Sequence, residues 1–140
     1  MKLSEMFRAE VVTAEPNETI RAAAEKMEKK NVGAIVVIQG RKVAGIVTDR
    51  DIALKVASGK ATPESPVSEI MTYNVTTIWD DQGVFNATQY VRGKKVRRLP
   101  IIDRENNLVG VLTVDDLIAL LSRELLNTAQ SFEPAIGTTL

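Results

Sequence analysis

The chain has 140 residues, the size of one compact domain or of two small halves that share a core. Its 18 basic and 18 acidic residues give a formal net charge of zero, which argues against general binding to nucleic acids or membrane surfaces. Cysteine and histidine are absent, which excludes disulfides, thiolate nucleophiles, histidine-based triads and the usual zinc sites. No apolar run is long enough to span a membrane, and the first ten residues do not resemble a signal peptide, so we expect a cytoplasmic protein.

The first elements predicted along the chain are a helical turn, a short strand and a helix. The segment LSEMF, residues 3–7, has the pattern of one helical turn, and the β-branched residues 11–13 favour a strand. A helix is expected after Pro16 with Thr19 as its N-cap, because apolar residues then recur at i, i+3, i+4 and i+7. The ordinary explanation of such a stripe is packing against a core.

Two strands and a second helix complete the first half. AIVVI, residues 34–38, predicts a buried strand that turns at Gln39-Gly40 and returns as VAGIVT, residues 43–48. The motif GIVTDRDI, residues 45–52, then leads into a helix expected from about Asp49 to Ser58.

The second half repeats this order. VSEIM follows LSEMF by 64 positions, and GVLTVDDL follows GIVTDRDI by 65, because one turn is a residue longer. We therefore predict an α/β (α+β) fold of tandem β-α-β-β-α repeats, packed sheet to sheet about a pseudo-twofold axis. The predicted boundaries are 1–60 for the first repeat, 61–66 for a linker, 67–130 for the second repeat and 131–140 for a frayed tail.

Each repeat contains a threonine followed three positions later by an aspartate, at the junction of a strand and a helix. These are Thr48 and Asp51 in the first copy and Thr113 and Asp116 in the second. The simplest interpretation is a capping box, which begins many helices. Two copies at matched positions inside matched halves indicate more than capping alone.

The doubled pattern resembles the CBS-domain family, whose paired form is the Bateman module and whose stand-alone members are bacterial or archaeal. The resemblance covers residues 3 to about 126 and is strongest in GIVTDRDI, GVLTVDDL and VRRLPIID, residues 96–103. It implies a non-enzymatic sensor that binds an adenine nucleotide (AMP, ADP, ATP or a related adenosyl ligand) between the repeats and requires no cofactor. It also implies a homodimer, formed through the first helix of each half with Ala22–Ala24 and Val84–Val91, that passes the bound state to another protein.

The resemblance further implies two clefts, each formed by both repeats. In each, the aspartate would accept hydrogen bonds from the ribose, and the threonine and helix N-terminus would meet the phosphate. The first cleft is expected to combine Thr48, Arg50, Asp51, Thr76, Thr77, Arg97, Arg98 and Pro100. The second is expected to combine Val12, Thr13, Gly33, Ala34, Thr113 and Asp116. We expect the second to bind more weakly, because Gly33 and Ala34 stand where the first has arginines.

Other functions remain open at this point. One is a ligand-free dimerisation module in which the threonine and aspartate only cap helices. Another is RNA binding through the basic run 92–98, which is disfavoured because no aromatic residues interleave it. A nucleotide-hydrolysing enzyme is disfavoured by the absence of histidine and of a metal-binding carboxylate cluster. Trp79, the single tryptophan, is expected in a loop, where it could stack on a base, cover the core edge or lie in a dimer contact.

Overall fold

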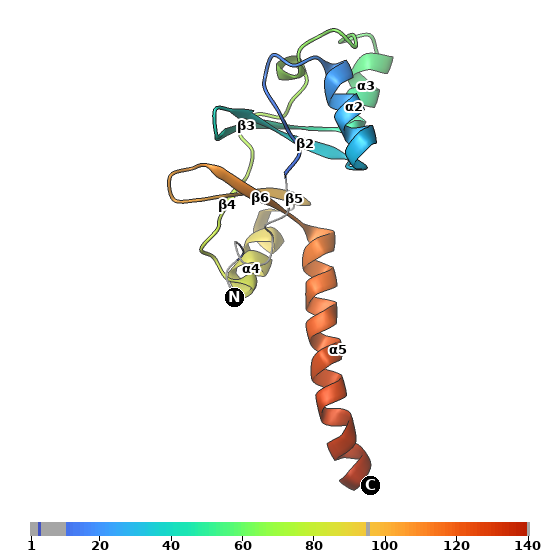
Figure 1. The fold of residues 1–140 in the computed structure, drawn as a ribbon, viewed down its shortest axis with the longest axis vertical. Coiled ribbons are helices and arrows are strands. Elements are labelled where there is room, and N and C mark those ends of the chain that lie inside the picture. The colour runs from blue at the N-terminus through green and yellow to red at the C-terminus, as the bar shows by residue number, and fades with distance from the viewer. Residues whose placement is uncertain (1–2, 4–10, 95, 140) are drawn as a thin grey trace.

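The first half of the chain forms a three-stranded sheet and two helices (Figure 1). In the computed structural model, which describes residues 3, 11–94 and 96–139, its elements are β1 (Thr13–Ala14), α2 (Ile20–Lys30), β2 (Ala34–Gln39), β3 (Lys42–Thr48) and α3 (Asp49–Ala57). The sheet order is β1-β2-β3, with β1 parallel and β3 antiparallel to β2. This confirms the β-α-β-β-α order predicted for the half.

The second half has the same order of elements. A 3₁₀ turn (Val67–Glu69) precedes β4 (Ile78–Trp79), α4 (Val84–Lys94), β5 (Arg98–Ile102), β6 (Leu108–Thr113) and α5 (Val114–Thr139). The sheet order is β4-β5-β6, again with one parallel and one antiparallel pair. The repeat inferred from sequence is therefore a repeat of structure.

The two sheets face each other at the centre of the molecule, with α2 and α3 outside the first sheet and α4 outside the second (Figure 1). Backbone hydrogen bonds join the halves at two places. Ile46 of β3 donates to the Thr72 carbonyl at 3.1 Å and accepts from the Thr72 N–H at 2.9 Å. At the hairpin tips, the Leu108 N–H donates to the Arg41 carbonyl at 2.9 Å. The predicted sheet-to-sheet packing is confirmed.

Each half completes its core with residues from the other end of the chain. Leu3 is fully buried with Ile78, Leu99 and Leu112 in the core of the second half, and its N–H donates to the Gln82 carbonyl at 3.0 Å. Conversely, residues that begin the second repeat lie in the core of the first half; they are Val67, Ile70 and Met71. The repeats in sequence and the two hydrophobic cores therefore do not coincide.

The short parallel strands begin later than the β-branched residues suggest. We expected strands at 11–13 and 75–77, but β1 begins at Thr13 and β4 at Ile78. Pairing decides these positions, because Thr13 lies opposite Val36 and Ile78 lies opposite Ile101. Trp79, expected in a loop, is the second residue of β4. Apart from Leu3, the helical turn predicted at 3–7 lies outside the described residues.

The linker and the C-terminal segment are more regular than the sequence suggested. Residues 61–66 bond back onto the start of α2, where the N–H groups of Ile20 and Arg21 donate to Ser65 and Pro63 at 2.9 Å each. Helix α5 continues to Thr139, across the segment for which we expected a frayed tail, and extends away from the sheets (Figure 1).

Candidate functional site

A cavity of about 340 Å³ lies between the two sheets. Most of its wall is aliphatic, and its polar side chains all come from the second half. Its lining residues are Val11, Val12, Val32, Gly33, Ala34, Val36, Ile46, Arg98, Val111, Thr113 and Asp116. Five of the six residues expected in the second cleft are therefore brought together; Thr13, the sixth, pairs in β1 and is not in this lining.

The polar end of the cavity is built where β6 becomes α5. The Thr113 hydroxyl accepts from the Asp116 N–H at 3.0 Å, as expected for an N-cap, and this fixes the first turn of the helix. Among the described residues, none donates a hydrogen bond to the Asp116 carboxylate. That carboxylate is therefore an available acceptor at the cavity wall, beside the partial positive charge of a helix N-terminus.

Arg98 lies in this cavity, although we grouped it with Thr48 and Asp51. Register explains its position, because Arg98 of β5 stands opposite Thr113 of β6. A methyl group placed on Gly33 would lie 3.6 Å from Nη2 of Arg98 and 3.1 Å from Oδ2 of Asp49. Gly33 therefore leaves room for the guanidinium where the two halves approach. The second cleft, expected to lack a cation, has one.

The first cleft has the same threonine–aspartate motif, but here the aspartate carboxylate already accepts a backbone hydrogen bond. The Thr48 hydroxyl accepts from the Asp51 N–H at 3.1 Å, and Asp51 Oδ2 accepts from the Thr48 N–H at 3.0 Å, which is a complete capping box. One oxygen of the Asp51 carboxylate is therefore already used by the backbone. The capping interpretation of the motif is confirmed at Thr48.

The other residues expected in the first cleft are dispersed. Arg97 pairs with Asp115 at 3.5 Å on the surface, where both side chains are about three-quarters exposed (74% and 81%). Arg50 is exposed at the start of α3, and Pro100 is fully buried opposite Val111 in the sheet. Thr77 lines a different cavity, and Thr76 is half-buried in the segment before β4.

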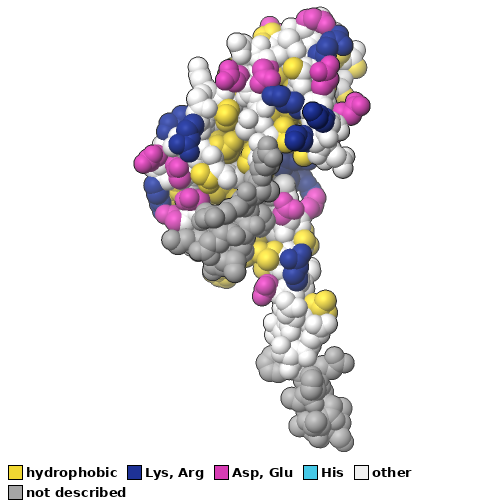
Figure 2. All heavy atoms as spheres, in the orientation of Figure 1, with side chains coloured by type: hydrophobic (Ala, Val, Ile, Leu, Met, Phe, Trp, Pro, Cys, Tyr) yellow, Lys and Arg dark blue, Asp and Glu magenta, His cyan; other side chains and the backbone are white. Residues whose placement is uncertain are grey.

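The basic run 92–98 does not form a single described patch. Arg97 is paired with Asp115 on the surface, whereas Arg98 lines the inter-sheet cavity, so the two arginines do not act as one basic patch. Figure 2 shows Lys and Arg side chains interspersed with Asp and Glu on the face it presents. This arrangement gives little support to the RNA-binding alternative.

Two further features are absent from the described part of the chain. There, no three acidic side chains come together as a metal site would require. None of the helices there is both long and apolar enough to cross a membrane.

Comparison with known proteins identifies the class. The family model of the CBS domain matches the chain twice, over residues 3–58 and 67–123. The chain therefore belongs to the CBS-domain family and contains a pair of CBS domains. The CBS domain-containing protein YhcV of Bacillus subtilis is 37% identical over 115 residues, which cover 82% of this chain and 81% of YhcV.

Solved structures with the same fold include two with bound adenosyl compounds. The CBS domain pair of protein MJ0100, in complex with 5′-methylthioadenosine and S-adenosyl-L-methionine, has a TM-score of 0.76 and 26% identity, covering 89% of this chain and 98% of that one. The CBS domain protein PAE2072 from Pyrobaculum aerophilum, complexed with AMP, has a TM-score of 0.72 and 25% identity, covering 83% and 89%.

Proposed function

We propose that this CBS pair is a non-enzymatic sensor that binds an adenosyl ligand, such as AMP, ADP, ATP or S-adenosylmethionine, in the cavity lined by Arg98, Thr113 and Asp116. The observation that carries the proposal is the unoccupied hydrogen-bonding capacity of the Asp116 carboxylate, opposite an aliphatic slot. The bound state would then be passed to a partner protein through the shape of the two facing sheets.

The lining matches the three parts of such a ligand. The valine and isoleucine side chains form an apolar slot for a flat base. The Asp116 carboxylate can accept hydrogen bonds from both ribose hydroxyls. Arg98 and the N-terminus of α5 favour an anionic group, such as a phosphate. A volume of about 340 Å³ falls within the range of about 300–1,000 Å³ that is usual for small-molecule sites.

The geometry favours the second cleft over the first, which reverses the ranking expected from sequence. Asp51 already accepts a backbone N–H, whereas Asp116 is free of described donors. Arg98, the arginine that lines the inter-sheet cavity, belongs to the second cleft. We therefore infer that Asp116 contributes more to binding than Asp51.

Calorimetry on the matched pair Asp116→Asn and Asp51→Asn tests this proposal. Asparagine keeps the shape of the side chain and the backbone N–H that donates to the capping threonine, but it removes the negative charge. A hydrogen bond to a charged group contributes about 1.5–3 kcal/mol, so Asp116→Asn should weaken AMP or S-adenosylmethionine roughly 10- to 150-fold. Asp51→Asn should change affinity much less. If Asp51→Asn abolishes binding and Asp116→Asn does not, the ligand occupies the first cleft.

Arg98→Gln separates phosphate recognition from base recognition. The variant should weaken AMP and ATP but leave adenosine nearly unchanged, because adenosine has no phosphate to pair with a guanidinium. The advantage of AMP over adenosine should also shrink as salt is raised from low ionic strength, since exposed charges are screened over about 8–10 Å. An equal loss for all three compounds would mean that Arg98 supports the cavity wall rather than a phosphate.

We also propose that the protein is a homodimer, with a contact surface that keeps α4 of the expected surface and replaces α2 with α5. We expected Ala22–Ala24 of α2 and residues 84–91 of α4 to form the contact. Ala23 and Ala87 are, however, fully buried inside their own halves. The large apolar side chains that remain exposed on the second half include Phe85 of α4 and Leu125 of α5. We place the dimer contact on those helices.

A further inference from the structure

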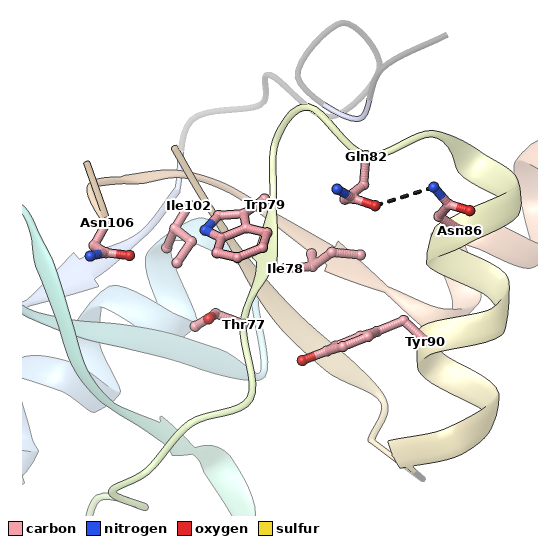
Figure 3. Close-up of a pocket in the computed structure, with 8 residues that line it drawn as sticks. All are labelled: Thr77, Ile78, Trp79, Gln82, Asn86, Tyr90, Ile102 and Asn106. Carbon is pink, nitrogen blue, oxygen red and sulfur yellow. Dashed lines mark hydrogen bonds between the residues drawn. The ribbon is translucent and has the colours of Figure 1, made fainter. Parts of the chain in front are cut away.

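A second cavity, of about 400 Å³, lies in the second half between β4 and α4, and it shares no lining residue with the inter-sheet cavity (Figure 3). Its walls come from β4, the following loop, α4 and the β5–β6 hairpin. The lining residues are Thr77, Ile78, Trp79, Gln82, Asn86, Tyr90, Ile102 and Asn106. This volume is also in the usual range for small-molecule sites, about 300–1,000 Å³.

The lining combines aromatic rings with uncharged hydrogen-bonding groups. Trp79 and Tyr90 supply two rings from different elements, and the amides of Gln82, Asn86 and Asn106 supply both donors and acceptors (Figure 3). Gln82 Oε1 accepts from Asn86 Nδ2 at 3.2 Å, so these two amides hold each other in place. No lining residue carries a formal charge.

Arg104 contacts the Trp79 ring and holds it in position. The guanidinium carbon of Arg104 lies 3.8 Å from the ring centroid, which is a close cation–π contact. Arg104 is fixed in turn by Asp81, whose oxygens accept from Nε at 2.6 Å and from Nη2 at 3.1 Å. The Arg104 hydrogen bond lowers the pKa of Asp81, so the pair stays charged well into the acid range. The indole is therefore positioned before any ligand arrives.

The first half has an ion pair at the positions equivalent to Gln82 and Tyr90. The residues 64 positions before Gln82 and Tyr90 are Glu18 and Lys26. Lys26 Nζ donates to Glu18 Oε1 at 2.8 Å and to the Thr13 carbonyl at 2.9 Å, so the ammonium spans the space from helix to strand. In the second half a neutral amide and a phenol replace this ion pair. The positions that carry an ion pair in the first half therefore carry uncharged hydrogen-bonding groups in the second.

We propose that this cavity is a binding site for an uncharged, flat heterocycle with amide-type edges, such as a free nucleobase or nicotinamide. Such a ring stacks on an aromatic side chain whatever its substituents, and the carboxamides pair with its donors and acceptors as asparagine and glutamine do with base edges. The neutral lining disfavours a phosphate or a carboxylate, and Arg104, which stacks on Trp79, is already bound to Asp81.

Trp79 makes the site directly observable, because it is the single tryptophan of the chain. Nicotinamide, uracil and hypoxanthine are titrated separately while tryptophan emission is recorded, with glucose as a non-planar neutral comparison. Saturable quenching by at least one flat compound, but not by glucose, supports the proposal. No saturable change with any of the three up to millimolar concentrations would overturn it, as would quenching by glucose of equal strength.

Two variants test whether the heterocycle binds in this cavity. The double variant Gln82→Glu with Tyr90→Lys rebuilds the ion pair of the first half and should weaken the quenching at least tenfold. Asn86→Ala removes one amide at an exposed helix position and should weaken it several-fold without disturbing the core. Undiminished quenching in both variants would place the ligand elsewhere. If the double variant does not fold, Asn86→Ala alone decides.

The heterocycle site and the proposed adenosyl site can be tested independently of each other. Asp116→Asn, which should weaken AMP, should leave the quenching of Trp79 by the flat heterocycle unchanged, because the two cavities share no residue. Loss of the quenching in Asp116→Asn would mean that the heterocycle binds in the inter-sheet cavity and would overturn the second site.

Discussion

Gly45 lies where β3 crosses the segment that leaves the 3₁₀ turn. A Cβ at this position would lie 2.7 Å from Sδ of Met71 and 2.8 Å from the carbonyl oxygen of Thr72. Because Thr72 is bonded to Ile46 in both directions, this carbonyl is held where it is. The glycine of the repeated motif therefore serves close packing between the halves rather than a backbone conformation that favours glycine.

Gly45→Ala should destabilise the protein by about 1–3 kcal/mol, since overpacking a well-packed region typically costs that much. At roughly 2–6 °C per kcal/mol for a chain of this length, thermal melting should show a fall of several degrees or more. Gly93→Ala is the matched control: it lies in α4 with nothing within 4 Å of the added methyl group, and alanine is favoured in a helix. A Gly45→Ala variant as stable as the control would contradict the close approach.

At the scale of elements, α2 and its counterpart α4 differ in how they are tied to the sheet. Helix α2 begins at the N-cap Thr19, whose hydroxyl accepts from the Ala22 N–H at 3.1 Å, and Lys26 then ties it to Glu18 and β1. Burial raises the pKa of Glu18, but the Lys26 hydrogen bond and charge and the Glu15 N–H outweigh it, so the pKa is lowered overall.

The Glu18–Lys26 pair should make stability depend on pH. A carboxyl group whose folded pKa is depressed contributes stability that is present above its unfolded value, here 4.5, and is lost as the pH falls through the folded pKa. At pH 7, Glu18→Gln should cost about 0.5–1 kcal/mol, because the pair is partly exposed. At pH 3 the variant and the wild type should melt at closer temperatures. Glu28→Gln, at an exposed position of the same helix, is the control; a pH-independent gap for Glu18→Gln would contradict the prediction.

The elements were predictable from sequence where a local signal determines them. The start of α2 at Thr19 and of α3 after Thr48 follows from side-chain caps, and the hairpin strands follow from aliphatic runs. The position of β1 was not predictable, because pairing with β2 sets it. The cleft assignment of Arg98 failed for a related reason: a sequence offset identifies equivalent positions but does not show to which side a long side chain turns.

At the scale of the whole molecule, the exposed apolar surface is concentrated on the second half. On α5, Ile118, Leu121 and Leu125 recur at i, i+3 and i+7, with exposed fractions of 56%, 43% and 71%. Phe85 on α4 is 73% exposed. Exposed apolar side chains that gather on one side of the molecule mark a contact site more often than a free surface, and the spacing on α5 is that of helices that pack against each other.

Light scattering at tens of micromolar should give the mass of a homodimer. Leu125→Glu should shift it toward the monomer, because a charge would be buried in the contact. Arg123→Glu is the control, since a rotation of about 100° per residue places it on the opposite side of α5. A monomeric wild type, or a Leu125→Glu variant that stays fully dimeric, would contradict the proposed contact.

Because each half completes its core with residues from the other half, the order of synthesis limits when either half can fold. Leu3 is synthesised well before β5 and β6, yet its side chain reaches its place only after these strands, with Leu99 and Leu112, have been synthesised. The first sheet in turn stays open until Val67, Ile70 and Met71 have emerged, because they close its core. Neither half of a nascent chain is complete when its own sequence ends, so we expect the two CBS domains to reach protease resistance together, after β6 has been synthesised, rather than one after the other.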